Sequence, residues 1–291
     1  MHVCRVLRCG PVTTDPDTWT YGDFAPDPTS RDLPGLKARW LIEQLPVAAS
    51  PRVLDYGTGE GKHLRLVRSF KSQARLVGVD VRAPHEPVDF EFHRVAADAP
   101  LPFAADGFDL VISCDVLEHV ASLEQSLDEI RRVLRPGGSF IGFVPAEGGS
   151  GPHALFRLLD RNVYRDTKDH HHAYTRRELL DRFKSRFDVV RLAYSYHLLG
   201  ATLDAAFFAS FKAPIVGPRM EAFWRGQEND VYRTRASATP SRSLLSRFVR
   251  LANHAAYLES SLLKNIALGA KGLHFHLAKP GAAGVADHTV P

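Results

Sequence analysis

Short runs of β-branched and aromatic residues alternate with helical stretches along the middle of the chain. The runs lie at 53–54, 76–79, 90–95, 108–113, 140–144 and 187–193. Such alternation is typical of a parallel sheet with helices on both faces. A last run at 273–278 alternates apolar residues with His274 and His276, which predicts a strand with one polar face. The pattern therefore predicts an α/β fold.

Capping residues predict where two helices begin. Ser122 stands three residues before Gln125, and Thr175 three before Glu178, each ahead of leucines at helical spacing. The first of these helices should end before the Pro136-Gly137-Gly138 turn. Another helix is expected at 34–44, after an irregular, proline-bearing lead-in.

About 75 residues separate the strand at 187–193 from the last strand, which is longer than a normal connection. Within them, 243–267 carries leucines at helical spacing. The pattern predicts an insertion with helices of its own.

Composition changes this picture mainly through charge. The chain has 291 residues, 44% of them hydrophobic, which excludes collagen-like, disulfide-dense and generally disordered classes. Residues 1–150 carry 16 basic and 21 acidic side chains, whereas 151–291 carry 21 and 12. A basic second half indicates an anionic partner such as a phosphorylated substrate, a membrane surface or RNA, and a solvated basic face explains it equally well.

The cysteines and apolar segments bear on location. Three cysteines are too few for a disulfide framework, and Cys4 and Cys9 lack a second pair for zinc. The residues near the start lack the apolar run that a secretory signal needs, so we do not expect one. The segment 192–211 is interrupted by polar residues too often for a membrane span. We expect a cytoplasmic protein, with peripheral contact at the inner membrane surface as a further option.

A glycine-rich turn joins the first strand to the next helix. Asp55, Gly57, Gly59 and Gly61 place backbone amides where a ligand can approach them and a helix N-terminus can face an anion. A dinucleotide fingerprint, GxGxxG, would need its third glycine at position 62, where Lys62 stands. The pattern here is instead GxGxG.

Two carboxylates follow the next strands. Asp80 comes 21 residues after Gly59, where it can accept hydrogen bonds from ribose hydroxyls. Asp98 follows the third strand, in a position to receive an adenine amino group. Taken singly, a carboxylate in such a position is more often an ordinary strand-end side chain than a ligand.

Together with Phe108-Asp109-Leu110-Val111, Glu118-His119 and Leu134-Arg135-Pro136-Gly137-Gly138, these residues resemble the class I S-adenosylmethionine-dependent methyltransferases, in their broad small-molecule branch. The resemblance covers 51–195 and the last strand. It implies a Rossmann-like, doubly wound, seven-stranded sheet with an antiparallel last strand and a helical insertion between the final two strands. It also implies S-adenosyl-L-methionine as cofactor.

The resemblance assigns roles to residues. Asp55, Gly57 and Gly59 would line the methionine portion, with Gly61 in the same turn, and Asp80 and Asp98 would hold the ribose and the adenine. Cys114 and Asp115 would border the reactive sulfonium. Phe90 comes only nine positions after Val81, so the helix usual there should be shortened or lost.

Methyl transfer to a hydroxyl needs a base or a metal near the acceptor. His170, His172 and Tyr174 precede the capped helix at Thr175 and are the predicted catalytic residues, with His172 or its neighbour His170 as base. The alternative is a hydrogen-bonded loop that orders that helix.

A metal is the second route. Asp115, Glu118 and His119 have the i, i+3, i+4 spacing of one helical face. They are similar to the acidic-x-x-Glu-His set that holds a divalent cation in some quinone-pathway O-methyltransferases. A packing and capping role is the alternative, and the sequence assigns no metal.

The insertion indicates the acceptor. It mixes aromatic residues with cations: Phe207, Phe208, Phe211, Phe223 and Trp224 with Lys212, Arg219 and Arg225. This mixture suits a lid over an apolar acceptor, a membrane-surface contact or RNA stacking. An Asn/Asp-Pro-Pro-aromatic tetrapeptide, typical of nucleobase N-methyltransferases, is replaced by residues 114–117, so nucleic acid is disfavoured.

We therefore expect a methyltransferase that acts on a small-molecule or lipid-linked acceptor, at oxygen. A catalytically silent S-adenosylmethionine-binding module and a nicotinamide-dependent oxidoreductase are the alternatives. The expected organisation is a lead-in and helix (1–50), the cofactor-binding core (51–195), a helical substrate cap (196–271), the last core strand (272–279) and a disordered tail (280–291).

Overall fold

The computed structural model describes residues 27–85, 87–149, 152–159, 170, 172–211 and 244–281. These residues contain one seven-stranded sheet in the order β3-β2-β1-β4-β5-β7-β6. The strands are β1 (Arg52–Tyr56), β2 (Arg75–Asp80), β3 (Glu91–Arg94), β4 (Phe108–Cys114), β5 (Leu134–Pro145), β6 (Asp188–Ser195) and β7 (Gly272–Ala278). The helices are α1 (Leu33–Glu43), α2 (Lys62–Phe70), α3 (Leu123–Val133), α4 (Pro152–Leu159), α6 (Arg176–Lys184), α7 (Leu198–Phe211) and α9 (Leu244–Leu263).

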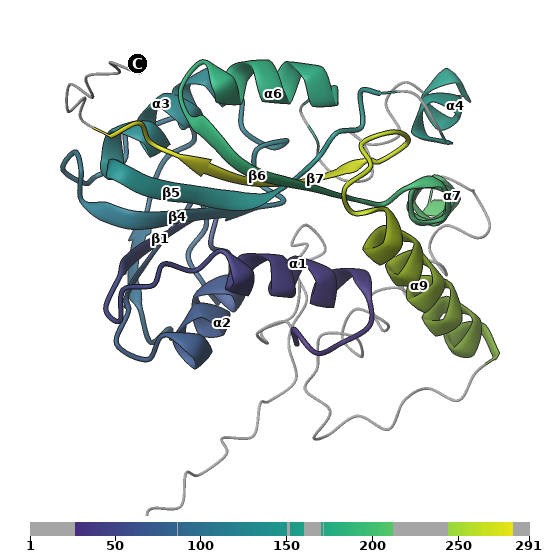
Figure 1. Cartoon of the computed structure of the whole chain (residues 1–291), viewed down its shortest axis with the longest axis horizontal. Coiled ribbons are helices and arrows are strands. Elements are labelled where there is room, and N and C mark those ends of the chain that lie inside the picture. Colours follow the sequence, from purple (N-terminus) through teal and green to yellow (C-terminus); the bar gives the residue numbers. More distant parts are fainter. Residues whose placement is uncertain are drawn as a thin grey trace, which may run out of the picture.

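The sheet has the predicted topology. β3, β2, β1, β4 and β5 are parallel to one another, and β7 runs antiparallel between β5 and β6. Helices α3 and α6 cover one face, and α1 and α2 cover the other (Figure 1). Because α7 and α9 lie between β6 and β7 in the chain, the expected helical insertion is confirmed.

Side-chain caps fix the beginnings of the helices. Ser122 accepts a hydrogen bond from the Gln125 amide, and Thr175 and Glu178 form the complete capping box before α6. Asp32 caps α1 by accepting from the Gly35 amide at 2.7 Å, a contact that the sequence analysis did not identify. In the described part of 81–90 there is no helix, as expected from its length.

Two apolar cores hold the layers together. Leu127 and Ile130 of α3 pack with Phe140 and Phe275 on one face of the sheet. On the other face, side chains of α1 and α2 pack against β1, β4 and β5; they include Leu41, Leu64, Ile112 and Ile141. The sheet is therefore buried on both sides, which holds its strand ends rigidly.

The last strand departs from its predicted polarity. His274 is only 1% exposed, contacts the Trp40 ring of α1 at 5.7 Å and hydrogen-bonds to Ser195 Oγ at 2.9 Å. The expectation of one polar face was wrong because β7 lies inside the sheet, where helices cover both faces.

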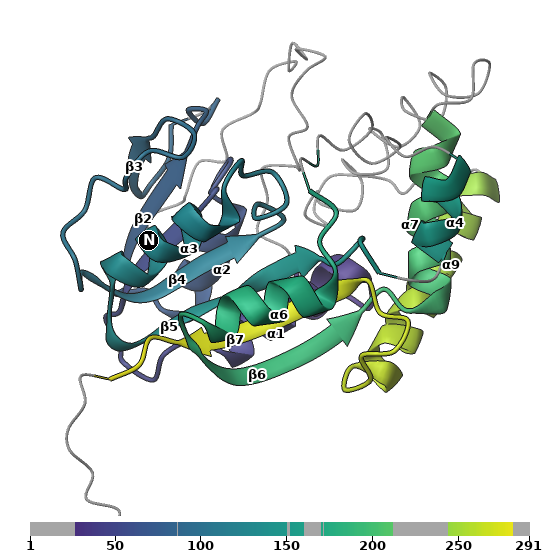
Figure 2. The same cartoon turned by 90° about the horizontal axis from the view of Figure 1, so that it is seen from above.

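Three helices gather beyond the carboxyl ends of β5 and β6. α4, α7 and α9 stand together there (Figure 2), and α7 contacts both of the others. Pro152 stands at the first position of α4, where its missing amide hydrogen is tolerated. Among the described residues, none of the helices has the length and apolar character needed to cross a bilayer.

Some expectations concern residues outside those that the structure describes. The lead-in over 1–26 and the tail from 282 onward lie outside the described residues. The same holds for Phe223, Trp224 and the three cations Lys212, Arg219 and Arg225, while Phe207, Phe208 and Phe211 belong to α7.

Candidate active site

The candidate residues lie along the edge of the sheet where the parallel strands end. β1, β2, β4 and β5 are parallel, so their carboxyl ends meet at this edge. Gly272, which opens β7, pairs with both Pro145 and Ser195, so the end of β6 lies there as well. In open α/β sheets, ligands bind at this edge.

The glycine turn is closely packed at two of its three glycines. Gly57 and Gly61 have left-handed φ angles of 79° and 82°. A Cβ at Gly57 would lie 2.3 Å from Val116, and one at Gly61 would lie 2.2 Å from the Phe90 ring. A Cβ at Gly59 would have no atom within 4 Å, so the turn has open space above its centre. The turn is thus a rigid cradle with room at the middle.

Asp80 fastens this turn to the second strand. Its Oδ2 accepts a hydrogen bond from the Gly59 amide at 2.8 Å, and its Oδ1 accepts from the Arg82 amide at 3.0 Å. A carboxylate offers about four acceptor positions, so Asp80 keeps capacity for two more donors. It is half-buried and can reach a ligand.

Asp98 lies before the start of α3. Its φ angle is 55°, and its Oδ1 accepts from the Ser122 amide at 3.3 Å. Its backbone carbonyl accepts from the Gln125 side chain at 2.8 Å. The half-buried carboxylate is held in a fixed position next to the edge where Asp80 lies.

Asp55 lies beneath the turn and is fully buried. Its Oδ2 accepts from the Thr58 hydroxyl at 3.0 Å, whereas its Oδ1 has no hydrogen-bond partner within the described part of the chain. A buried carboxylate oxygen without a donor is costly, so it favours a ligand that brings one. The cradle, Asp80 and this oxygen together fit an adenosyl amino acid.

Asp115 is paired with a residue that the sequence analysis missed. Lys37 of α1 donates to both of its carboxylate oxygens, at 2.8 and 2.7 Å, and lies 3.7 Å above the Phe143 ring. Burial alone would raise the pKa of Asp115, but the charges of Lys37 and Lys62 outweigh it and lower that pKa to about 2. Cys114, next to it, is buried, and burial raises the pKa of its thiol.

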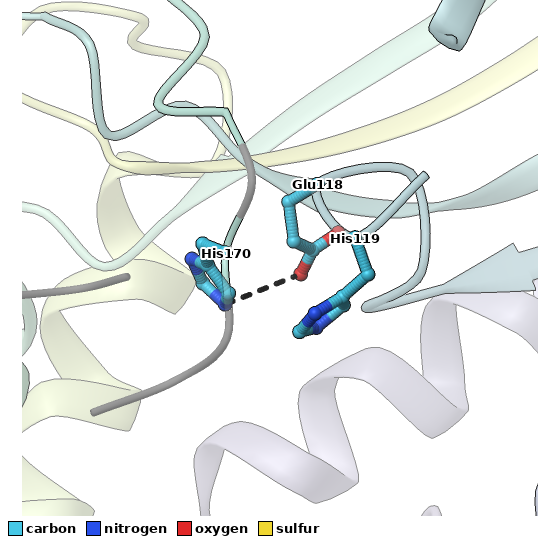
Figure 3. A group of neighbouring side chains, drawn as sticks. All are labelled: Glu118, His119 and His170. Atoms are coloured by element: carbon cyan, nitrogen blue, oxygen red, sulfur yellow. Dashed lines mark ion pairs between the residues drawn. The ribbon is translucent and has the colours of Figure 1, made fainter. Parts of the chain in front are cut away.

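The predicted helical face at 115–119 was wrong. These residues form a turn after β4, and Asp115 has a φ angle of 56°, so the i, i+3, i+4 spacing does not bring the three side chains together. Within the described ranges, the neighbouring ligand atoms are instead those of Glu118, His119 and His170, all within 4.8 Å of one another (Figure 3).

His170 is buried between two carboxylates. Its Nδ1 lies 2.8 Å from Glu147 Oε2, and its Nε2 lies 3.8 Å from Glu118 Oε1. Burial and the charges of Asp115 and Glu147 raise the pKa of Glu118 well above its usual range. Glu147 also pairs with Lys271 at 2.9 Å. Sequence reasoning missed Glu147 and Lys271, because they follow β5 and precede β7, far apart in the chain.

His172 and Tyr174 differ in exposure. His172 is exposed, its Nε2 lies 3.3 Å from the Ala121 carbonyl, and its ring centroid is 5.1 Å from that of Tyr174. Tyr174 is 8% exposed and belongs to the core against α3 and α6. Burial raises the pKa of its hydroxyl to about 12.

Comparison with known proteins identifies the family. Residues 30–190 match a family described as a methyltransferase domain. Methyltransferase GfsG from Streptomyces halstedii is 34% identical over 138 residues, 42% of this chain and 49% of its own. A ubiquinone/menaquinone biosynthesis C-methyltransferase from Geotalea daltonii is 30% identical over 117 residues, 35% of this chain and 49% of its own. The chain spans about half or less of the curated relatives that it matches first.

Two solved structures share the fold. A putative methyltransferase from Bacillus halodurans aligns over 84% of this chain and all of its own, with a TM-score of 0.51 and 15% identity. Geranyl diphosphate C-methyltransferase from Streptomyces coelicolor, solved with Mg²⁺, geranyl-S-thiolodiphosphate and S-adenosyl-L-homocysteine, aligns over 85% of this chain and 76% of its own, with a TM-score of 0.51 and 15% identity.

Proposed function

Because this chain belongs to the class I S-adenosylmethionine-dependent methyltransferases, we propose that it methylates a hydroxyl of a small-molecule or lipid-linked acceptor, with His172 as base. The observation that carries the choice of base is the exposed imidazole of His172 at the carboxyl edge, beside the turn after β4.

The cofactor is S-adenosyl-L-methionine, which supplies an electrophilic methyl group when bound. Asp80 would accept hydrogen bonds from the ribose, and Asp98 from the adenine amino group. The turn formed by Gly57, Gly59 and Gly61 would hold the amino acid portion above Asp55. The open space at Gly59, the spare acceptor capacity of Asp80 and the unpaired Asp55 Oδ1 support this assignment. Cys114 and Asp115 would border the reacting centre.

The tautomer of His172 suits proton transfer. A carbonyl oxygen only accepts, so Nε2 must donate its proton to Ala121, which leaves the lone pair of Nδ1 to take a proton. In the proposed reaction, the acceptor's C–O–H loses its proton to Nδ1 while the oxygen forms a bond to the methyl carbon and the carbon–sulfur bond breaks. His170 is buried between carboxylates and is the less suitable base. Tyr174 would position His172 through their ring contact.

The helices at the carboxyl edge favour an apolar acceptor. On α9, Phe248, Leu251, Leu258 and Leu262 are all exposed and fall on one stripe at 100° per residue. Leu155 and Leu158 of α4 are exposed as well. Such a surface suits a lipid-linked substrate and shallow contact with the inner membrane surface, aided by nearby cations such as Arg247. In this proposal 196–271 caps the acceptor and the protein works in the cytoplasm.

Transfer of a labelled methyl group tests the proposal. The purified full-length protein is incubated with labelled S-adenosylmethionine and a lysate. The labelled products are then separated into polyprenyl-linked, phenolic and RNA pools. We expect label in an alkali-stable ether of a small or lipid-linked product. His172→Ala should lower turnover roughly 10²- to 10⁴-fold at unchanged S-adenosylhomocysteine affinity, with His93→Ala as the matched control.

Other outcomes overturn parts of the proposal. Label confined to RNA would contradict the acceptor class, and bound cofactor with no labelled product in any pool would indicate a silent binding module. Co-sedimentation with anionic but not neutral vesicles is the expected result for membrane contact. Equal recovery in both supernatants would leave a cap without membrane contact.

A further inference from the structure

A second cluster of polar side chains lies at the same edge and takes no part in the proposed reaction. Glu118 and His119 come from the turn after β4, and His170 comes from the segment before α6 (Figure 3). The carboxylate of Glu118 points toward both imidazoles. We propose that these three side chains bind one divalent transition-metal ion of the zinc type.

The spacing of the donor atoms supports a metal. Metal–ligand bonds of about 2.0–2.2 Å place ligand atoms roughly 3 to 4 Å apart. His170 Nε2 and Glu118 Oε1 are 3.8 Å apart, and the full set lies within 4.8 Å. A contraction of about 1 Å at the longest separation brings all three into range, which side-chain rotation can supply.

The orphaned oxygen of Glu118 is the second observation. Glu118 is 1% exposed, and its Oε2 has no hydrogen-bond partner among the residues described. An unpartnered carboxylate oxygen in the interior is unfavourable, and a bound cation relieves that cost.

The surroundings of His170 are those of a metal-binding histidine. Ligating histidines almost always donate their other ring nitrogen to a carboxylate or carbonyl, which fixes the ring and its tautomer. Glu147 does this at His170 Nδ1, so Nε2 faces the cluster. Lys271, at 2.9 Å from Glu147 and 2.5 Å from Asp204, holds Glu147 in place.

The donor set selects the metal. Two imidazoles and one carboxylate suit Zn²⁺, Fe²⁺ or Co²⁺, whereas Mg²⁺ and Ca²⁺ prefer oxygen ligands only. Three protein ligands leave a coordination position open, as in catalytic rather than structural zinc sites. Water or an oxygen of a ligand can occupy it.

Metal binding by the full-length protein tests the proposal. Protein stripped with a chelator is dialysed against zinc, and metal per chain is measured by mass spectrometry; Co²⁺ titration follows the visible absorption. We expect one zinc per chain, no displacement by millimolar Mg²⁺, and a d–d spectrum with Co²⁺. His119→Ala and His170→Ala should each weaken binding by 100-fold or more, and Glu147→Gln by about 10- to 100-fold. His172→Ala is the matched control and should bind zinc like the wild type.

Every other outcome counts against the site. His119 is half-buried, so His119→Ala is the variant most able to keep its fold, which S-adenosylhomocysteine binding checks. Wild-type zinc affinity in folded His119→Ala, or equal losses in His172→Ala, overturns the proposal. A wild-type chain that binds S-adenosylhomocysteine but no zinc overturns this inference and leaves the proposed function standing.

Discussion

Replacing Lys37 by Met tests how strongly α1 is tied to the end of β4. Lys37 and Asp115 have side chains that are 19% and 25% exposed, so their pairing is screened only partly by solvent. Methionine keeps the length of the side chain and its packing over Phe143 but removes the charge. The variant therefore isolates the electrostatic part of the contact.

The magnitude follows from the pKa of Asp115. Its fall from 3.8 to about 2 corresponds to roughly 2 kcal/mol of folding free energy near neutral pH. Lys62 contributes part of this shift, and burial opposes it, so we expect Lys37→Met to cost about 1 to 2 kcal/mol. Since the pKa is depressed on folding, the stabilisation is present above pH 4 and is lost as the pH falls toward 2.

Urea denaturation followed by circular dichroism measures the effect at pH 7 and at pH 3. Arg177→Met is the matched control, because Arg177 and Asp181 form an exposed pair at 3.8 Å that should be worth under about 0.5 kcal/mol. Asp115→Asn in the Lys37→Met background completes a double-mutant cycle. Equal costs for Lys37→Met and Arg177→Met, or a pH-independent cost for Lys37→Met, would refute the reasoning.

Three further predictions concern the N-terminal capping box of α6, the buried His274 and the glycine turn. Thr175→Ala removes the capping box of α6 and should cost about 1 kcal/mol in urea denaturation, whereas Ser185→Ala at the other end of the helix should cost less. Burial lowers the pKa of His274 to about 3, so wild-type stability should fall from pH 6.5 toward pH 4 by up to about 3 kcal/mol, and His274→Gln should flatten that dependence; parallel curves would contradict it. Gly57→Ala places a Cβ 2.3 Å from Val116 at a φ of 79°, so it should weaken S-adenosylhomocysteine binding at least tenfold by calorimetry, and Gly149→Ala, whose Cβ meets its first neighbour at 3.9 Å, should not.

The sheet and its helix starts could be predicted because they depend on local patterns. Apolar runs gave the strands, and Ser122 and Thr175 marked helix starts through contacts three residues away. The burial of His274 could not be predicted, because alternation of polar and apolar residues is the same for an edge strand and for a central strand whose polar groups are paired.

The candidate site, like the fold, could be predicted from the sequence only in part. Asp80 and the glycine turn follow from strand-turn-helix spacing, and Gly59 and Asp80 are indeed hydrogen-bonded. The contacts of Lys37 with Asp115 and of Glu147 with His170 join residues 78 and 23 positions apart, and no periodicity encodes them. The i, i+3, i+4 spacing at 115–119 misled because the left-handed backbone at Asp115 prevents a helix from starting there.

Calorimetric titration of the full-length protein with S-adenosylhomocysteine tests the central claim, that the glycine turn and Asp80 form the cofactor site, most directly. We predict stoichiometric binding that Asp80→Ala weakens by about 1 to 3 kcal/mol, or roughly 5- to 150-fold, because the ribose loses its charged acceptor. Asp188→Ala, which removes an exposed carboxylate at the opposite end of the sheet, should leave the affinity unchanged. No binding at millimolar ligand, or equal affinities for wild type and Asp80→Ala, would contradict the account.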